Sequence, residues 1–151
     1  MAKMRGVDAF PQLWERRETL QDERGNSYEL LSLPDLVQAK KTQREKDWPM
    51  LRRLVEAHYF EHGDDPSAAR IDFWFRELRT PELLIRLAAK YPERRSRAVE
   101  ARPLLQAAFG GDLDTLSREL ENEMLIESAA DRAYWAPLKR DLEALRKQRG
   151  R

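Results

Sequence analysis

The chain has 151 residues, close to the usual size of one domain. Charged residues make up 36% of it and hydrophobic residues 41%, a very polar composition that still supplies enough apolar side chains for a core. Its 28 Lys and Arg nearly balance its 27 Asp and Glu, so the formal charge of +1 gives no overall field that would steer it toward nucleic acid or an anionic membrane. The chain has no cysteine, which excludes disulfides, thiolate metal sites and thiol nucleophiles.

No segment has the length and apolar character of a signal peptide or of a membrane-spanning helix. The lack of cysteine also suits a reducing compartment. We therefore expect a soluble, cytoplasmic chain with no membrane partner.

The first elements expected along the chain are a short helix and a β-hairpin. Residues 7–17 carry apolar side chains at helical spacing. Residues 18–23 and 27–33 flank the turn-forming triplet Arg24-Gly25-Asn26, which predicts two antiparallel strands. No other strand signal occurs.

The rest of the chain predicts helices, separated by capping residues and prolines. They are expected from Ser32-Leu33-Pro34-Asp35 to about Gln43, from Asp47 to about His62, from Asp64-Asp65-Pro66 through Leu78, from Thr80-Pro81 to Tyr91, from Pro103 to Gly110, and from Asp112 onward. The expected fold is mostly α (α+β), a small N-terminal β-hairpin followed by a five- to six-helix bundle. We expect one domain over residues 1–151, made of a strand-helix unit over 1–62 and a helical part over 63–151.

The last helical region contains two apolar stripes. The first consists of Leu113, Leu116, Leu120 and Met124, and the second of Tyr134, Leu138, Leu142 and Leu145. Pro137 lies between them and predicts a break at Ala136-Pro137. A packed helical hairpin and a bent helix both fit this pattern.

Charged residues continue the apolar face of the helix that follows the hairpin. Helical steps from its apolar residues lead to Lys40, then Arg44, then Asp47. Two cations one turn apart are costly in a closed core but useful in a cleft that holds an anion. Alternatively, Asp47 is the N-cap of the next helix and Arg44 pairs with it, and the two interpretations stay open.

The stretch from Leu31 to Asp47 resembles the later, C-terminal part of a nucleotidyltransferase-like fold of the abortive-infection toxin type. The pattern LS-x-x-DL is followed by Lys40 and then by Arg44, Lys46 and Asp47, which match a lysine and an R-x-K-D signature. The resemblance covers about residues 26–60, so the strand-helix unit over 1–62 is expected to be nucleotidyltransferase-like. In many members one more residue separates the lysine from the arginine.

The resemblance implies a nucleotide or phosphate site and a role of toxin-antitoxin type. In such a site Lys40 and Arg44 would face the phosphates of a Mg nucleotide, while Lys46 and Asp47 would organise the following helix. Glu29 falls where some relatives place a third acid on the strand.

The catalytic part of such an enzyme is missing. Two carboxylates in a D-x-D arrangement after a glycine turn must hold the Mg²⁺ ions, and no such element precedes residue 30. Gly110-Gly111-Asp112 is better explained as a helix C-cap followed by an N-cap. We therefore expect no catalytic residues and an enzyme only if another chain completes it. Met1 and Met4 stand almost directly before the first expected helix, so a lost upstream segment is a further expectation.

Two histidines one helical turn apart, His58 and His62, could offer a metal two imidazoles. The glutamate that a zinc protease carries directly after its first histidine is absent. Histidines at the edge of a core are the favoured interpretation, and no metal site is predicted.

Basic residues dominate segments 91–102 and 139–151, which raises the question of nucleic acid. Neither segment alternates aromatic and basic residues as a base-stacking surface does. Segment 112–131 is strongly acidic, so internally complementary helices are favoured and nucleic acid is not expected.

Two hypotheses for the function follow. The first is a catalytically incomplete nucleotidyltransferase-like protein that binds a nucleotide or phosphate ligand, or completes its site with a partner chain. The alternative is a helical protein-protein interaction or oligomerisation module, with no small-molecule site, that binds a partner or a second copy.

Overall fold

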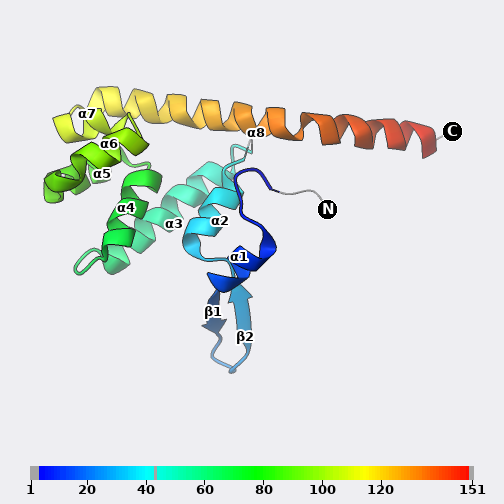
Figure 1. Ribbon diagram of the computed structural model, residues 1–151, viewed down its shortest axis with the longest axis horizontal. Helices are drawn as coiled ribbons and strands as arrows, with labels where there is room; N and C mark the ends of the chain where they lie inside the picture. The colour runs from blue at the N-terminus through cyan, green and yellow to red at the C-terminus, as the bar shows by residue number, and fades with distance from the viewer. Residues whose placement is uncertain (1–3, 43, 150–151) are drawn as a thin grey trace. The chain divides into compact units, whose positions relative to one another are not determined.

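The computed structural model describes residues 4–42 and 44–149. They form a mostly helical structure with one two-stranded antiparallel sheet near the N-terminus, which confirms the predicted fold class (Figure 1). The elements are α1 (Phe10–Glu15), β1 (Glu18–Gln21), β2 (Ser27–Leu30), α2 (Leu33–Lys40), α3 (Asp47–His62), α4 (Ala68–Glu77), α5 (Pro81–Lys90), the 3-10 helix η1 (Pro92–Arg94), α6 (Arg95–Ala101), α7 (Leu105–Gly110) and α8 (Leu113–Arg149).

The contacts divide the chain into two compact units. One, the helical unit, is Arg44–Ser128, and the other, the hairpin unit, contains the described residues of 1–43 and 129–151. The expected single domain stays a prediction.

The β-hairpin is amphipathic and exposed on both faces. β1 and β2 pair with Leu20 opposite Tyr28 and Thr19 opposite Glu29. Because side chains alternate along a strand, Leu20, Tyr28 and Leu30 share one face while Thr19 and Glu29 share the other. Both strands are exposed throughout.

The start of α2 agrees with its predicted capping signal. The Ser32 hydroxyl accepts a hydrogen bond from the Asp35 backbone N–H at 3.4 Å, and Pro34 lies in the first turn. Arg16 donates two hydrogen bonds to the Asp35 carboxylate, at 2.8 and 3.0 Å. These bonds from Arg16 hold the pKa of Asp35 below its usual value, against the opposing effect of burial. α2 ends at Lys40, before the predicted end near Gln43, which lies outside the described residues.

The segment before α1 lies against α2 and against the later part of α8. Gly6 has φ +69°, a left-handed conformation that favours glycine, and a Cβ there would lie 2.4 Å from the end of the Gln38 side chain. Arg5 donates to the Lys41 carbonyl at 3.4 Å and its Nε lies 3.8 Å from the Asp131 carboxylate. These contacts hold the N-terminal segment within the hairpin unit.

The helical unit is built around α4. α3 and α6 pack on α4, and α7 packs on α5 and α6 (Figure 1). Trp74 of α4 is completely buried, and Ile71 and Phe75 are nearly so. The core residues of this unit are Trp48, Leu51, Val55, Ile71, Phe73, Trp74, Phe75, Leu78, Leu83, Leu84, Leu87, Ala88, Ala98, Leu105, Ala108, Leu116 and Leu120.

Most of the predicted helices of this unit are found, with corrections at several ends. α4 begins at Ala68 with Ser67 as its N-cap, not at Asp64-Asp65-Pro66, because the Ser67 hydroxyl accepts from the Arg70 N–H at 3.3 Å. The basic segment after Tyr91 forms η1 and α6, which the sequence did not predict.

The junction between α7 and α8 is a C-cap followed by an N-cap, as predicted. Gly111 adopts the left-handed conformation with φ +72° that ends α7. The Asp112 carboxylate accepts from the Thr115 N–H at 3.0 Å, and this bond lowers the pKa of Asp112. The Asp112 carboxylate thus caps α8, and among the described residues no group of three or more potential metal ligands includes this junction.

α8 is one helix of 37 residues that continues through Pro137. The predicted break at Ala136-Pro137 is therefore wrong, and so is a helical hairpin. Proline removes one backbone hydrogen bond, and the turns on either side hold the helix together across it. Within residues 4–42 and 44–149, no helix has a stretch long and apolar enough to cross a membrane.

Candidate functional site

The residues predicted for a phosphate site fall in both units. Lys40 lies in the last turn of α2, in the hairpin unit, while Arg44, Lys46 and Asp47 belong to the helical unit. The nucleotide site remains a prediction.

Arg44 and Asp47 form the helix junction that was the alternative interpretation. Asp47 is buried, and its carboxylate lies 3.8 Å from Arg44 Nε, while its backbone N–H donates to the Arg44 carbonyl at 3.0 Å. Asp47 is the first residue of α3 and not its N-cap; Lys46 holds that position and makes no side-chain capping bond. The two charges therefore act at least partly on each other.

Glu29 is part of the polar face of the hairpin. Its carboxylate lies 2.6 Å from Arg17 Nε and accepts a hydrogen bond from Thr19 at 3.2 Å. These cross-strand contacts give Glu29 a structural role in pairing β1 with β2.

His58 and His62 lie at the edge of the aromatic core of the helical unit. Trp74 Nε1 donates to His58 Nδ1 at 2.9 Å, and the His58 ring meets those of His62 and Phe73 edge to face. Phe73 lies off the apolar stripe that Ile71, Trp74 and Phe75 form along α4, so its contact with His58 belongs to a second packing surface. Within the part of the chain that the structure describes, no group of three or more potential metal ligands comes together.

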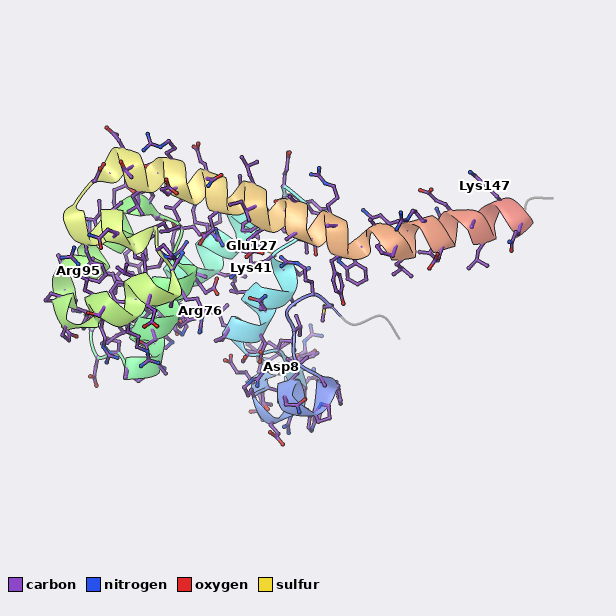
Figure 2. The ribbon with its side chains drawn as sticks, turned by 45° about the horizontal axis from the view of Figure 1, so that its top comes forward. Asp8, Lys41, Arg76, Arg95, Glu127 and Lys147 are labelled. Carbon is purple, nitrogen blue, oxygen red and sulfur yellow. The ribbon has the colours of Figure 1, made fainter. Side chains whose placement is uncertain are left out.

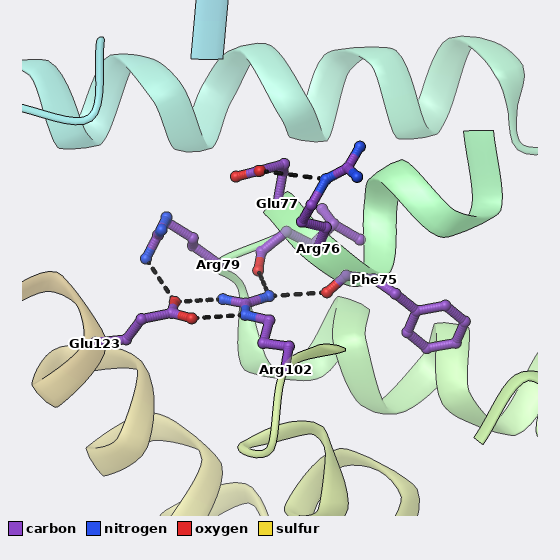
Figure 3. Close-up of polar contacts among 7 residues, drawn as sticks. Phe75, Arg76, Glu77, Arg79, Arg102 and Glu123 are labelled. Carbon is purple, nitrogen blue, oxygen red and sulfur yellow. Dashed lines mark hydrogen bonds and ion pairs between the residues drawn. The ribbon is translucent and has the colours of Figure 1, made fainter. Parts of the chain in front are cut away.

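A buried arginine closes the C-terminal end of α4. Arg102 is 6% exposed and donates to both oxygens of Glu123, at 2.8 and 2.6 Å. It also donates to the carbonyls of Phe75 and Leu78, at 3.0 and 2.8 Å (Figure 3). Arg102 therefore satisfies carbonyls that the end of a helix leaves without partners and ties them to α8.

Arg79 completes this cluster from the other side of Glu123. Its guanidinium lies 2.9 Å from the Glu123 carboxylate (Figure 3). It also lies 4.6 Å from the centre of the Trp48 ring. Burial lowers the pKa of Arg79, and the charge of Glu123 opposes that shift. The donors of Arg102 face carbonyls and a carboxylate of the protein itself, so the cluster acts as a structural clamp.

The strongest candidate for a functional surface is the last part of α8. All residues from 137 to 148 are exposed. Four large apolar residues at spacings of three and four form a stripe there and just before it, the C-terminal stripe. They are Tyr134, Leu138, Leu142 and Leu145, which are 44%, 38%, 45% and 53% exposed.

The C-terminal stripe begins three residues after Asp131, which lies near Arg5 of the N-terminal segment. Asp131, which Arg5 approaches, is buried and accepts from Trp135 Nε1 at 3.0 Å. Beyond Pro137 the side chains stand out from the ribbon on all sides, Lys147 among them (Figure 2). Within residues 4–42 and 44–149, nothing buries this apolar face fully.

Sequence reasoning found the residues of the stripe but missed the arginine clamp. Arg102 follows α6 directly and lies four residues after the buried Ala98, so the spacing from Ala98 was the signal that placed it inside. Its position in a run of basic residues concealed that signal.

Comparisons with known proteins give no relative: no family model, no curated protein and no solved structure matches the chain.

Proposed function

We propose that this protein is a helical interaction module whose C-terminal stripe binds a helix of a protein partner. The observation that carries the proposal is that Leu138, Leu142 and Leu145 lie at helical spacing in a segment exposed on every side. An apolar face of this kind is how amphipathic helices recognise one another.

Residues 137–148 lack the packing that normally stabilises a helix. Short helices are marginal in water, and in proteins most of their stability comes from burying an apolar face. The preceding part of α8 nucleates the helix through residues 137–148, but the leucines of this segment are only about half buried. Completing the burial of each leucine would stabilise a complex by about 1 kcal/mol, since full burial is worth about 1.5–3 kcal/mol.

The rest of the molecule supports an interaction module over an enzyme. Arg102 is used in the clamp, and the other buried charges of the helical unit have partners as well: Asp47 lies 3.8 Å from Arg44 and Glu77 lies 3.6 Å from Arg76. Of the predicted ligand residues, Glu29 contacts Arg17 and Thr19, and Arg44 contacts Asp47. The apolar stripe is a run of large apolar side chains along one helix that the described part of the chain leaves exposed.

The proposal is tested by photo-crosslinking in the cells that naturally produce the protein. A photoreactive amino acid replaces Leu142 in one variant and Arg140 in a matched control, because two residues turn a helix by about 200° and place the control on the opposite face. We expect a discrete adduct of defined mass from position 142 and none from position 140. Mass spectrometry identifies the partner, and the purified pair must then bind. No adduct at 142, or equal adducts at both positions, contradicts the proposal.

A further inference from the structure

We infer that the C-terminal stripe pairs with the same stripe of a second copy of this chain, in parallel orientation and in register. This inference rests on the proposed function and names its partner. The charges that border the stripe select this orientation.

The two borders of the stripe carry opposite charges. Around the helix axis, with about 100° per residue, Asp141 and Gln148 lie on one side of the line through Leu138, Leu142 and Leu145. Lys139 and Arg146 lie on the other side. All four border residues are exposed. The stripe therefore has one acidic or neutral border and one basic border.

This asymmetry selects the orientation of a symmetric pair. In a parallel pair of helices the acidic or neutral border of one copy faces the basic border of the other copy. A residue on the first border then meets the residue five positions later in the sequence of the partner. Asp141 of one copy then faces Arg146 of the second copy, and the contact occurs twice because the pair is symmetric. In an antiparallel pair each border faces itself, so the basic residues Lys139 and Arg146 would meet their own counterparts. Charge complementarity thus favours the parallel arrangement.

The spacing of the apolar residues fits the same arrangement. Leu138, Leu142 and Leu145 of the stripe, with the half-buried Trp135 in place of Tyr134, follow the alternating steps of three and four that form the seam of a two-stranded coiled coil. The seam covers about two heptads, fewer than a strong coiled coil uses. We therefore expect a reversible dimer that forms in the micromolar range or above, with the charge pairs strongest at low salt.

The first test is sedimentation of the full chain from about 5 to about 500 μM, over concentrations that span such an equilibrium. We expect a shift from monomer toward dimer with rising concentration. Leu142→Glu should raise the dissociation constant at least about tenfold, because it places a charge in the seam. Circular dichroism checks that the variant keeps its helices, and Arg140→Glu, on the opposite face, is the matched control.

The charge pairs are tested by swapping them. Asp141→Arg replaces two attractive contacts with two repulsive ones and should weaken the dimer about tenfold at low salt. Asp141→Arg combined with Arg146→Asp restores the pairs in reversed order and should return the dissociation constant to within about twofold of the original. A single swap without effect contradicts the parallel pairing of these borders.

The orientation is read from introduced cysteines, which the absence of natural cysteine makes unambiguous. The variants Leu138→Cys and Leu145→Cys are oxidised separately, and a mixture of the two variants is oxidised as a third sample. In a parallel pair each position faces its own copy, so both single samples should form disulfide-linked dimers. An antiparallel pair cannot bring both positions against themselves, and it would link 138 to 145 in the mixture. Arg140→Cys should stay unlinked.

The outcomes separate this inference from the proposed function. A chain that stays monomeric up to about 500 μM, or that links only 138 to 145, overturns the parallel self-pairing. The proposed function survives that result if the photoreactive residue at position 142 couples to a different protein, and it fails if no face-specific adduct forms.

Discussion

The helical unit and the C-terminal stripe treat their leucines in opposite ways. In the helical unit Leu84 and Leu87 are completely buried, and even the charge of Arg102 has four hydrogen bonds inside the unit. In the stripe Leu142 and Leu145 stay about half exposed although they follow the same helical spacing. The helical spacing of apolar residues in the sequence identifies an apolar face, whereas only the structure tells whether the chain itself covers that face.

The first of two large effects is expected from breaking the arginine clamp of the helical unit. Arg102→Ala leaves the buried Phe75 and Leu78 carbonyls without this donor and removes a partner of Glu123. Removing one member of a buried charge pair costs about 3–5 kcal/mol, and because Glu123 is a quarter exposed we expect about 3 kcal/mol. Urea unfolding measures the loss.

The matched control for this variant is an arginine of the same unit at the surface. Arg97 is 76% exposed and lies 3.4 Å from Asp72, so Arg97→Ala should change the free energy of unfolding by less than about 0.5 kcal/mol. Equal losses from the two arginines would show that Arg102 does not hold α4 and α8 together.

The second large effect tests the difference between a buried leucine and an exposed leucine. Leu87→Ala creates a cavity in the helical unit and should lower the free energy of unfolding by about 2–5 kcal/mol. Leu142→Ala, measured in dilute solution where the chain is monomeric, should lower it by less than about 0.5 kcal/mol. The order should reverse for self-association, which Leu142→Ala weakens and which Leu87→Ala changes little while the chain stays folded. A large loss of stability from Leu142→Ala would mean that the stripe already packs within the monomer.

Local signals predicted most of the fold. The hairpin turn, the Ser32 cap of α2 and the Gly111-Asp112 junction depend on residues within a few positions of one another, and all three are found. The break at Pro137 was wrong because a proline costs one hydrogen bond locally while the long helix around it supplies many. α6 was missed because its charges concealed Ala98, the residue that it buries.

The candidate site was predicted only in part, for a physical reason. Spacing alone placed Leu138, Leu142 and Leu145 on one face, but exposure depends on contacts between distant parts of the chain. The same holds for Arg102, whose partners Phe75 and Glu123 lie more than twenty residues away. Charge patterns in the sequence could not say which cations are buried.

A smaller effect is expected in the hairpin unit, where the ion pair of Asp35 is near the surface. Because its pKa is lowered in the folded state, Asp35 contributes stability above its unfolded pKa of about 3.9, and this contribution is lost as the pH falls through the folded pKa. Asp35→Asn should destabilise α2 by at most about 1 kcal/mol at pH 7, since solvent screens Arg16. Hydrogen exchange of the α2 amides measures this, and the difference from the unchanged protein should shrink below about pH 4. A difference independent of pH would assign the effect to helix capping alone.

The smallest effect is expected from nucleotides, which test the resemblance to nucleotidyltransferases. A nucleotide at 100 times its dissociation constant would stabilise the chain by about 2.7 kcal/mol, a shift that thermal unfolding with millimolar ATP, GTP or CTP and Mg²⁺ detects easily. We expect no shift, because Arg44 lies against Asp47 and Glu29 is engaged with Arg17. A shift that disappears in Lys40→Ala/Arg44→Ala would reverse this expectation. It would place a phosphate ligand at Lys40 and Arg44, and the search would then move to the chain that supplies the missing carboxylates.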